Sequence, residues 1–159
     1  MARLTRPKLQ FYDNRPITRA YLFTRTILLV IASVILHYEA LLRLSNLIRS
    51  LKIHSRFLVV YGVIGALIAH VSEVMIFAFG YYFLVPYSQY GTLIGKFSGS
   101  FRDCAYFSFA TYTSLGYGDI TPIGHLRFMA GLEVLTGLVL ISWTASFMFI
   151  QMQRFWSEQ

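Results

Sequence analysis

The chain of 159 residues has few of the charged side chains that keep a soluble protein in water. Only 13% of its residues are charged and 56% are hydrophobic, whereas about 25% charged residues is usual for a soluble domain. Acidic residues are especially scarce, with 7 Asp and Glu against 14 Lys and Arg. This composition argues against a soluble domain and predicts one membrane domain. It also argues against a nucleic-acid binder, whose basic surface would not be embedded in so much apolar sequence.

Cysteine and a recognisable leader are lacking as well. Cys104 is the only cysteine, so no disulfide can form within one chain. Residues 1–20 are basic but lack an immediate apolar core and a small-residue cleavage site, so we expect no cleaved signal peptide. His37, His54 and His125 show no spacing that would indicate a metal site, and no nucleophile–base set suggests an enzyme. We therefore expect no catalytic residues, no cofactor and no small-molecule substrate.

Long apolar runs are abundant instead. Residues 57–84 and 128–152 are each long enough to cross about 30 Å of hydrocarbon as a helix that satisfies its own backbone. Residues 21–42 form a weaker candidate because Arg25 and Glu39 interrupt the run. Such a segment can cross the membrane or lie flat at its interface. We favour the crossing, which predicts an all-α membrane protein with one helix ahead of two strong spans.

The positive charge indicates which side of the membrane each end occupies. The basic loop at residues 43–56 is expected to be cytoplasmic. Three of its basic residues recur at multiples of three, namely Arg43, Arg49 and Lys52. A voltage sensor uses such spacing, but only one weak helix precedes these residues, so the loop interpretation is preferred. If residues 21–42 span, the basic tail at 1–20 lies outside, against the positive-inside rule, whereas a flat helix removes that conflict.

The connection between the two strong spans, residues 85–125, contains a further apolar piece. It begins with a turn-rich stretch that should form an exposed loop, with Pro86, Gly91, Gly95 and Gly99. Residues 101–113 follow and are aromatic but too short to span. Asp103 near their start suits a helix N-terminus. We expect a half-membrane helix that dips in and stops, and a turn at Pro122 and Gly124 into the last span.

The sequence TYTSLGYGDITP, residues 111–122, follows this short helix and is polar and glycine-rich. Non-helical backbone at membrane depth is costly unless it lines water or protein. Gly116 and Gly118 allow positive φ, so left- and right-handed conformations can alternate and turn successive carbonyls to one side. The side chains of Leu115 and Tyr117 would then point away. Carbonyl rings from four chains, near the negative end of the short helix, would favour a dehydrated cation.

The GYGD sequence between two spans, after a short aromatic helix and hydroxyls, resembles the pore signature of the potassium-channel superfamily. The resemblance is to small bacterial channels of the two-transmembrane pore-loop type, here with an extra N-terminal helix. It implies an outer helix, a re-entrant pore helix with a selectivity filter and an inner helix over residues 57–152, flanked by a short tail at 153–159. It also implies a four-fold symmetric homotetramer in the lipid of a bacterial plasma membrane, with K⁺ as the permeant ion.

The resemblance assigns roles to individual residues. The backbone that binds K⁺ would be Ser114, Leu115, Gly116, Tyr117 and Gly118. Asp119 would lie at the outer mouth, Tyr106 and Phe107 would belong to an aromatic cuff, and Thr113 would support the filter. Ser114 replaces the usual threonine and Leu115 the usual valine. Potassium selectivity should survive, but a weakly selective cation channel and a non-conducting accessory or sensor protein stay as alternatives.

Two acids and one glycine in the spans could support or move such a pore. Some relatives carry an acid on the pore helix where this chain has Ala110. Glu133 could replace it by accepting from hydroxyls such as Thr113, or it could pair with Arg127 at the interface. His70 and Glu73 share one face of the outer helix and form either a pH sensor or, as we favour, a satisfied polar pair. Gly137 is either a gating hinge or a site of close helix packing.

Overall fold

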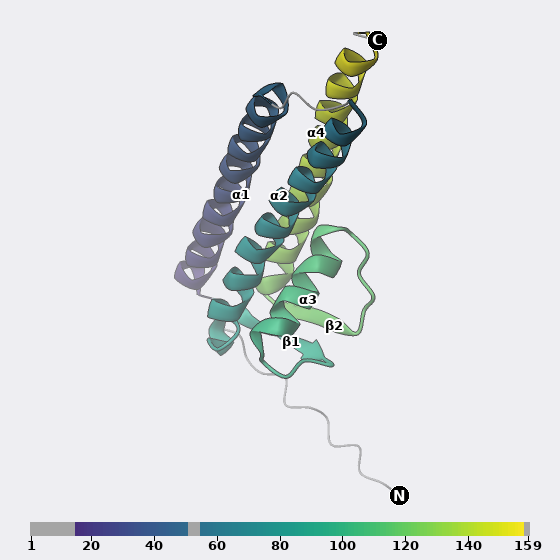
Figure 1. The fold of residues 1–159 in the computed structure, drawn as a ribbon. Coiled ribbons are helices and arrows are strands. Elements are labelled where there is room, and N and C mark those ends of the chain that lie inside the picture. Colours follow the sequence, from purple (N-terminus) through teal and green to yellow (C-terminus); the bar gives the residue numbers. More distant parts are fainter. Residues whose placement is uncertain (1–14, 51–54, 158–159) are drawn as a thin grey trace, which may run out of the picture.

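Three long helices run side by side in the computed structural model, which describes residues 15–50 and 55–157 (Figure 1). They are α1 (Pro16–Ser50), α2 (Ser55–Leu84) and α4 (Leu126–Ser157). At about 1.5 Å per residue, each is longer than the ~30 Å hydrocarbon core. Within the described ranges, these three helices are long and apolar enough to cross a membrane. The predicted all-α membrane fold, with one helix ahead of two strong spans, is confirmed.

Helix α1 packs along its neighbours from one end to the other. Near its start, Leu22 belongs to the main core together with Leu126 of α4. Near its end, Ser45 Oγ accepts a hydrogen bond from Gln151 Nε2 at 3.2 Å. Its first turns therefore lie at the same end of the molecule as the strands, and its last turns lie near the C-terminal part of α4 (Figure 1). This packing fits the spanning arrangement and does not fit a helix that lies flat on the membrane.

The basic loop expected at residues 43–56 is largely helical, so that expectation is wrong for its first half. Arg43 and Arg49 lie in the last turns of α1. Arg43 is exposed and pairs with Glu39 one turn earlier, with 3.7 Å between Nη2 and Oε2. Lys52 and His54 lie outside the described residues.

The short helix α3 (Phe101–Tyr112) lies where the sequence predicts it. Ser100 is its N-cap, and the Ser100 hydroxyl accepts from the Asp103 amide at 3.2 Å. Asp103 in turn accepts from the hydroxyl and the amide of Ser98, at 2.6 and 2.7 Å. These hydrogen bonds lower the pKa of the Asp103 carboxyl. Local capping therefore sets where α3, the predicted pore helix, begins.

A two-stranded antiparallel sheet holds the ends of the connection together, which the expected simple loop did not anticipate. Antiparallel strands β1 (Gly91–Gly95) and β2 (Ile120–Gly124) pair along their whole length, after a short 3₁₀ turn at Ser88–Tyr90. The approach is close at Gly95, whose φ is +106° and where an added Cβ would lie 2.0 Å from the Asp119 carbonyl oxygen. Pro122 and Gly124, expected as a turn, are part of β2. The pairing closes the loop that carries α3 and the polar segment.

The main core surrounds α3. Aromatic and aliphatic side chains from α2 and α4 pack against it with almost no exposure. The largest of them are Phe77, Tyr81, Leu126 and Met129, and Tyr112 of α3 itself is buried in the same core. The short helix is therefore wedged between the two long helices that follow α1, at the end of the bundle that also holds the strands (Figure 1).

Candidate functional site

The backbone of residues 113–119, directly after α3, alternates in handedness. Positive φ angles occur at Ser114 (+56°), Gly116 (+49°) and Gly118 (+80°), and not at the two residues between them. Two amides of the segment donate back to the end of α3: Ser114 N to Thr111 O at 2.9 Å, and Gly116 N to Ala110 O at 3.0 Å. The alternation that the glycines predict is therefore present, and it is anchored to the pore helix.

Ser114 extends the alternation beyond the glycines, which the sequence did not predict. A left-handed conformation costs an L-residue with a Cβ about 1–2 kcal/mol. The hydrogen bond from its amide to Thr111 O helps to hold it there. At Gly116 and Gly118, an added Cβ would meet nothing within 4 Å in the single chain. Glycine is therefore favoured at these two positions by backbone conformation and not by lack of space.

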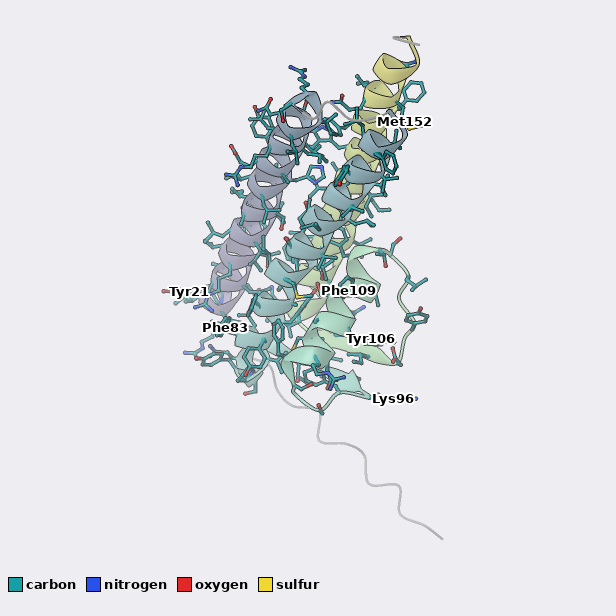
Figure 2. The ribbon with its side chains drawn as sticks, in the orientation of Figure 1. Tyr21, Phe83, Lys96, Tyr106, Phe109 and Met152 are labelled. Carbon is teal, nitrogen blue, oxygen red and sulfur yellow. The ribbon has the colours of Figure 1, made fainter. Side chains whose placement is uncertain are left out.

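The side chains of the segment lie against the pore helix on one side. Tyr117 stacks on Tyr106 of α3, with ring centroids 6.3 Å apart and planes 5° apart. The Tyr106 hydroxyl donates to Asp119 Oδ2 at 3.0 Å, and Figure 2 shows Tyr106 on the side of α3 nearest this segment. Phe107, predicted to belong to the same cuff, is instead buried against Tyr81 of α2, with centroids 4.9 Å apart.

Glu133 of α4 braces the pore helix, but through partners other than those predicted. Its carboxylate is fully buried and accepts from the Tyr81 hydroxyl at 2.6 Å and from the Ser108 hydroxyl. Ser108 also lies 2.9 Å from the carbonyl oxygen of Val74 on α2. The predicted kind of partner, a hydroxyl group, is present, but the named partners Thr113 and Arg127 are wrong, and the Thr113 hydroxyl donates to Phe109 O one turn earlier. Tyr81 is 52 residues from Glu133, so only the fold could reveal this contact.

Glu73 of α2 is the second buried carboxylate at the pore helix. Its oxygens lie 2.8 Å from His37 Nδ1 and 3.0 Å from His70 Nδ1, and it accepts from the Tyr112 hydroxyl at the end of α3. The predicted pairing of His70 with Glu73 is therefore present. His37 of α1 was missed because it lies 36 residues away in sequence. The spacing of the histidines gave no indication of a metal site, yet the fold gathers three possible ligands here, His37, His70 and Glu73.

Gly137 of α4 lies directly against the end of the pore helix. An added Cβ would lie 2.1 Å from the carbonyl oxygen of Tyr112. Helix α4 continues through this position without interruption. The structure thus gives Gly137 the close-packing role, and a gating hinge at this residue stays a prediction.

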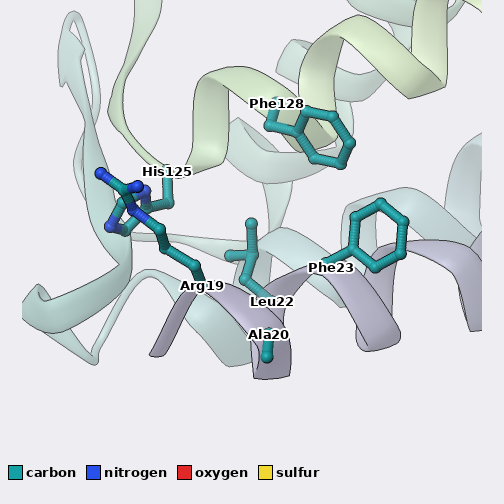
Figure 3. Close-up of a pocket in the computed structure, with 6 residues that line it drawn as sticks. All are labelled: Arg19, Ala20, Leu22, Phe23, His125 and Phe128. Carbon is teal, nitrogen blue, oxygen red and sulfur yellow. The ribbon is translucent and has the colours of Figure 1, made fainter. Parts of the chain in front are cut away.

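A cavity lies between the first turns of α1 and the start of α4 (Figure 3). It measures about 430 Å³ and is largely apolar. Its lining consists of Arg19, Ala20, Leu22, Phe23, His125 and Phe128. None of these residues belongs to the 113–119 segment or contacts it through a described hydrogen bond, so the cavity is not part of the candidate pathway.

Comparison with known proteins agrees with this architecture. A family model described as "Ion channel" matches residues 69–154, which is more than half of the chain. The match begins within α2, covers β1, α3, the polar segment and β2, and ends within α4. Helix α1 lies outside it. The chain belongs to this ion channel family, which is not a family of enzymes. Neither curated proteins nor solved structures gave a match. The protein is a multi-pass membrane protein of the ion channel class.

Proposed function

We propose that this protein conducts K⁺ passively through a filter of backbone carbonyls at residues 114–118. The observation that carries the proposal is the alternating handedness at Ser114, Gly116 and Gly118. Such alternation turns successive carbonyl oxygens toward one side, where they can replace the water around a dehydrated cation. The filter begins at the C-terminal end of α3, where the helix dipole favours a positive charge.

Four chains form the proposed pore in a bacterial plasma membrane, with lipid around them. One chain supplies one strand of carbonyls, and a ring around an ion needs several. In the single chain, the Leu115 and Tyr117 side chains are 58% and 66% exposed. Large apolar groups next to the filter are expected to be covered by neighbouring subunits. The homotetramer would supply that cover and complete the ring.

The experiment is ion flux into liposomes that contain only the purified full-length chain, with Na⁺ as the competing ion. Gly116→Ala should abolish or strongly reduce K⁺ flux, because the new Cβ disfavours positive φ in the filter. Gly99→Ala is the matched control. Gly99 also has positive φ (+83°) and open space for a Cβ, but it lies in the loop before α3. The Gly99→Ala protein should be less stable than wild type but keep its K⁺ selectivity.

Each outcome separates the candidate functions. K⁺ flux above Na⁺ flux, lost in Gly116→Ala and kept in Gly99→Ala, supports the proposal. Equal permeability to K⁺ and Na⁺ would instead favour a weakly selective cation channel, for which Ser114 in place of threonine gives a reason, because serine lacks the methyl that restricts χ1. A folded assembly that passes no ion favours the non-conducting accessory or sensor.

A further inference from the structure

We propose that His37, His70, Glu73 and Tyr112 form a binding site for a transition-metal cation of the zinc class, between α1, α2 and the pore helix. One ligand atom from each of His37, His70 and Glu73 lies within 4.8 Å of the others. His37 and Glu73 are fully buried, and His70 is 17% exposed. The site lies outside the backbone pathway for permeant ions and does not depend on conduction.

Glu73 brings the ligand atoms together. Both Nδ1 atoms face the carboxylate of Glu73, at 2.8 Å from Oε1 and 3.0 Å from Oε2. The hydroxyl oxygen of Tyr112 lies 3.2 Å from His70 Nδ1. Tetrahedral zinc with bonds of about 2.0–2.2 Å holds its ligand atoms roughly 3.3 Å apart. The three separations above are a few tenths of an ångström shorter, and the ligand atoms of the two histidines and Glu73 all lie within 4.8 Å of one another, so side-chain shifts would admit the ion.

The Nε2 atoms of both imidazoles lie near the hydrogen-bond acceptor that metal binding through Nδ1 would require. A histidine that binds a metal through Nδ1 carries a proton on Nε2, which needs an acceptor. Thr144 Oγ1 of α4 lies 3.0 Å from His70 Nε2 and 3.4 Å from His37 Nε2. A hydroxyl oxygen has two lone pairs, so this one atom can accept from both rings.

The same contacts are harder to satisfy without a cation. If both Nδ1–H groups donate to Glu73, both Nε2 atoms need a donor, and the single hydroxyl proton of Thr144 serves only one of them. One extra proton, or a metal ion, resolves this. Ser33, one turn before His37 on α1, has a buried hydroxyl with no hydrogen-bond partner among the described residues.

The donor set selects the class of metal. Two imidazoles, one carboxylate and one phenol oxygen suit Zn²⁺, Co²⁺ or Ni²⁺. Ca²⁺ takes six to eight oxygen ligands, and Mg²⁺ demands octahedral oxygen coordination, so neither fits two nitrogen ligands. An ion here would join His37 of α1 and Tyr112 of the pore helix through α2. It would thereby couple the helix that precedes the family domain to the start of the proposed filter.

The test is calorimetric titration of the purified full-length protein in detergent with Zn²⁺, and with Mg²⁺ as control ion. Wild type should bind one Zn²⁺ per chain with a Kd of about 10 µM or tighter, and should not bind Mg²⁺. His37→Gln and His70→Gln should each weaken Zn²⁺ binding at least about tenfold, and Thr144→Val by about tenfold or more. His125→Gln removes a histidine outside the site and should bind as wild type does.

A second readout locates the ion. Trp143 lies 5.2 Å from His37, ring centroid to ring centroid, and the chain has only 2 tryptophans. In a Trp156→Phe background, Co²⁺ should quench Trp143 fluorescence with the affinity found by calorimetry.

Three results would overturn the proposal. One is wild-type protein that shows no heat of Zn²⁺ binding. Another is Zn²⁺ binding that is the same in folded His37→Gln and His70→Gln as in wild type, and the third is Co²⁺ binding that leaves Trp143 fluorescence unchanged. The first and third need only proteins with an intact site, so they hold even if a histidine variant fails to fold. A protein that conducts no K⁺ can still bind the metal, so the two proposals fail separately.

Discussion

Two buried carboxylates hold the pore helix at positions four residues apart, and they do so in different ways. Glu133 of α4 contacts the hydroxyls of Ser108 and Tyr81. Glu73 of α2 contacts the hydroxyl of Tyr112 and also two imidazoles. The described partners of Glu133 are two hydroxyl groups, whereas those of Glu73 include two imidazole nitrogens, which are also common metal ligands.

The difference teaches that the two supports should respond differently to their surroundings. The Glu133 site connects three helices through two hydroxyl groups and should act as a constant brace. The Glu73 site is the proposed metal site, and it lies next to the first residues of the proposed filter. Metal binding should therefore affect the filter through Tyr112 and not through Ser108.

The largest expected effect comes from removing the acid with more partners. Glu73→Ala leaves the Tyr112 hydroxyl and two imidazoles without their acceptor in a buried place, which should cost about 3–5 kcal/mol. Thermal unfolding of the protein in detergent measures this. Glu39→Ala is the control, since its exposed pair with Arg43 should contribute at most about 0.5 kcal/mol. Equal losses in the two variants would contradict the central role of Glu73.

A smaller loss of stability is expected where α4 contacts Tyr112 at the end of the pore helix. Gly137→Ala would place a Cβ 2.1 Å from the Tyr112 carbonyl oxygen, and overpacking of this kind costs about 1–3 kcal/mol. Gly131→Ala in the same helix is the matched control, because its Cβ would meet nothing within 4 Å and alanine favours the helix. Denaturation midpoints should fall for the first variant only. If Gly137→Ala left the denaturation midpoint unchanged, the contact would accommodate a methyl group. That result would favour the hinge interpretation over close packing.

The two hydroxyls on the pore helix allow a direct comparison of the braces. Tyr112→Phe removes one donor to Glu73 and should cost about 1–3 kcal/mol. Ser108→Ala should cost about 1 kcal/mol, because Glu133 keeps its hydrogen bond from Tyr81. Unfolding free energies of the two variants and of the double variant would measure this. If Ser108→Ala were the more damaging change, Glu133 would be the dominant support.

The smallest effect concerns the exposed start of the pore helix. Ser98 lowers the pKa of Asp103, so the contact stabilises the fold at pH values above the unfolded-state pKa of about 4 and is lost as pH falls through the lower folded pKa. Asp103→Asn should therefore be slightly less stable than wild type near neutral pH. The difference in melting temperature should shrink in acid. A constant difference across pH would mean that the carboxylate charge at this position does not contribute.

The sequence alone predicted the elements that depend on local chemistry. The apolar runs predicted the long helices, because a span must satisfy its own backbone. The short helix at residues 101–113 and the alternating backbone at Gly116 and Gly118 also followed from local patterns, since glycine accepts positive φ without strain. Three features could not be predicted: the residues that bond to Glu133, the contact of His37 with Glu73, and the pairing of β1 with β2. They depend on which helix faces lie together and which distant strands pair.

The sequence by itself thus determined a membrane channel with three apolar helices, a half-membrane helix and a polar glycine segment after it. Local rules suffice there, because helix length, capping and backbone freedom depend on neighbours within a few residues. The tertiary structure alone decided that α1 packs along the pore domain. It also decided that Glu73 and Glu133 hold the pore helix by hydrogen bonds. It likewise decided that His37, His70 and Glu73 meet. Side chains 36 to 52 residues apart find one another only through packing, which depends on the shapes of whole helices.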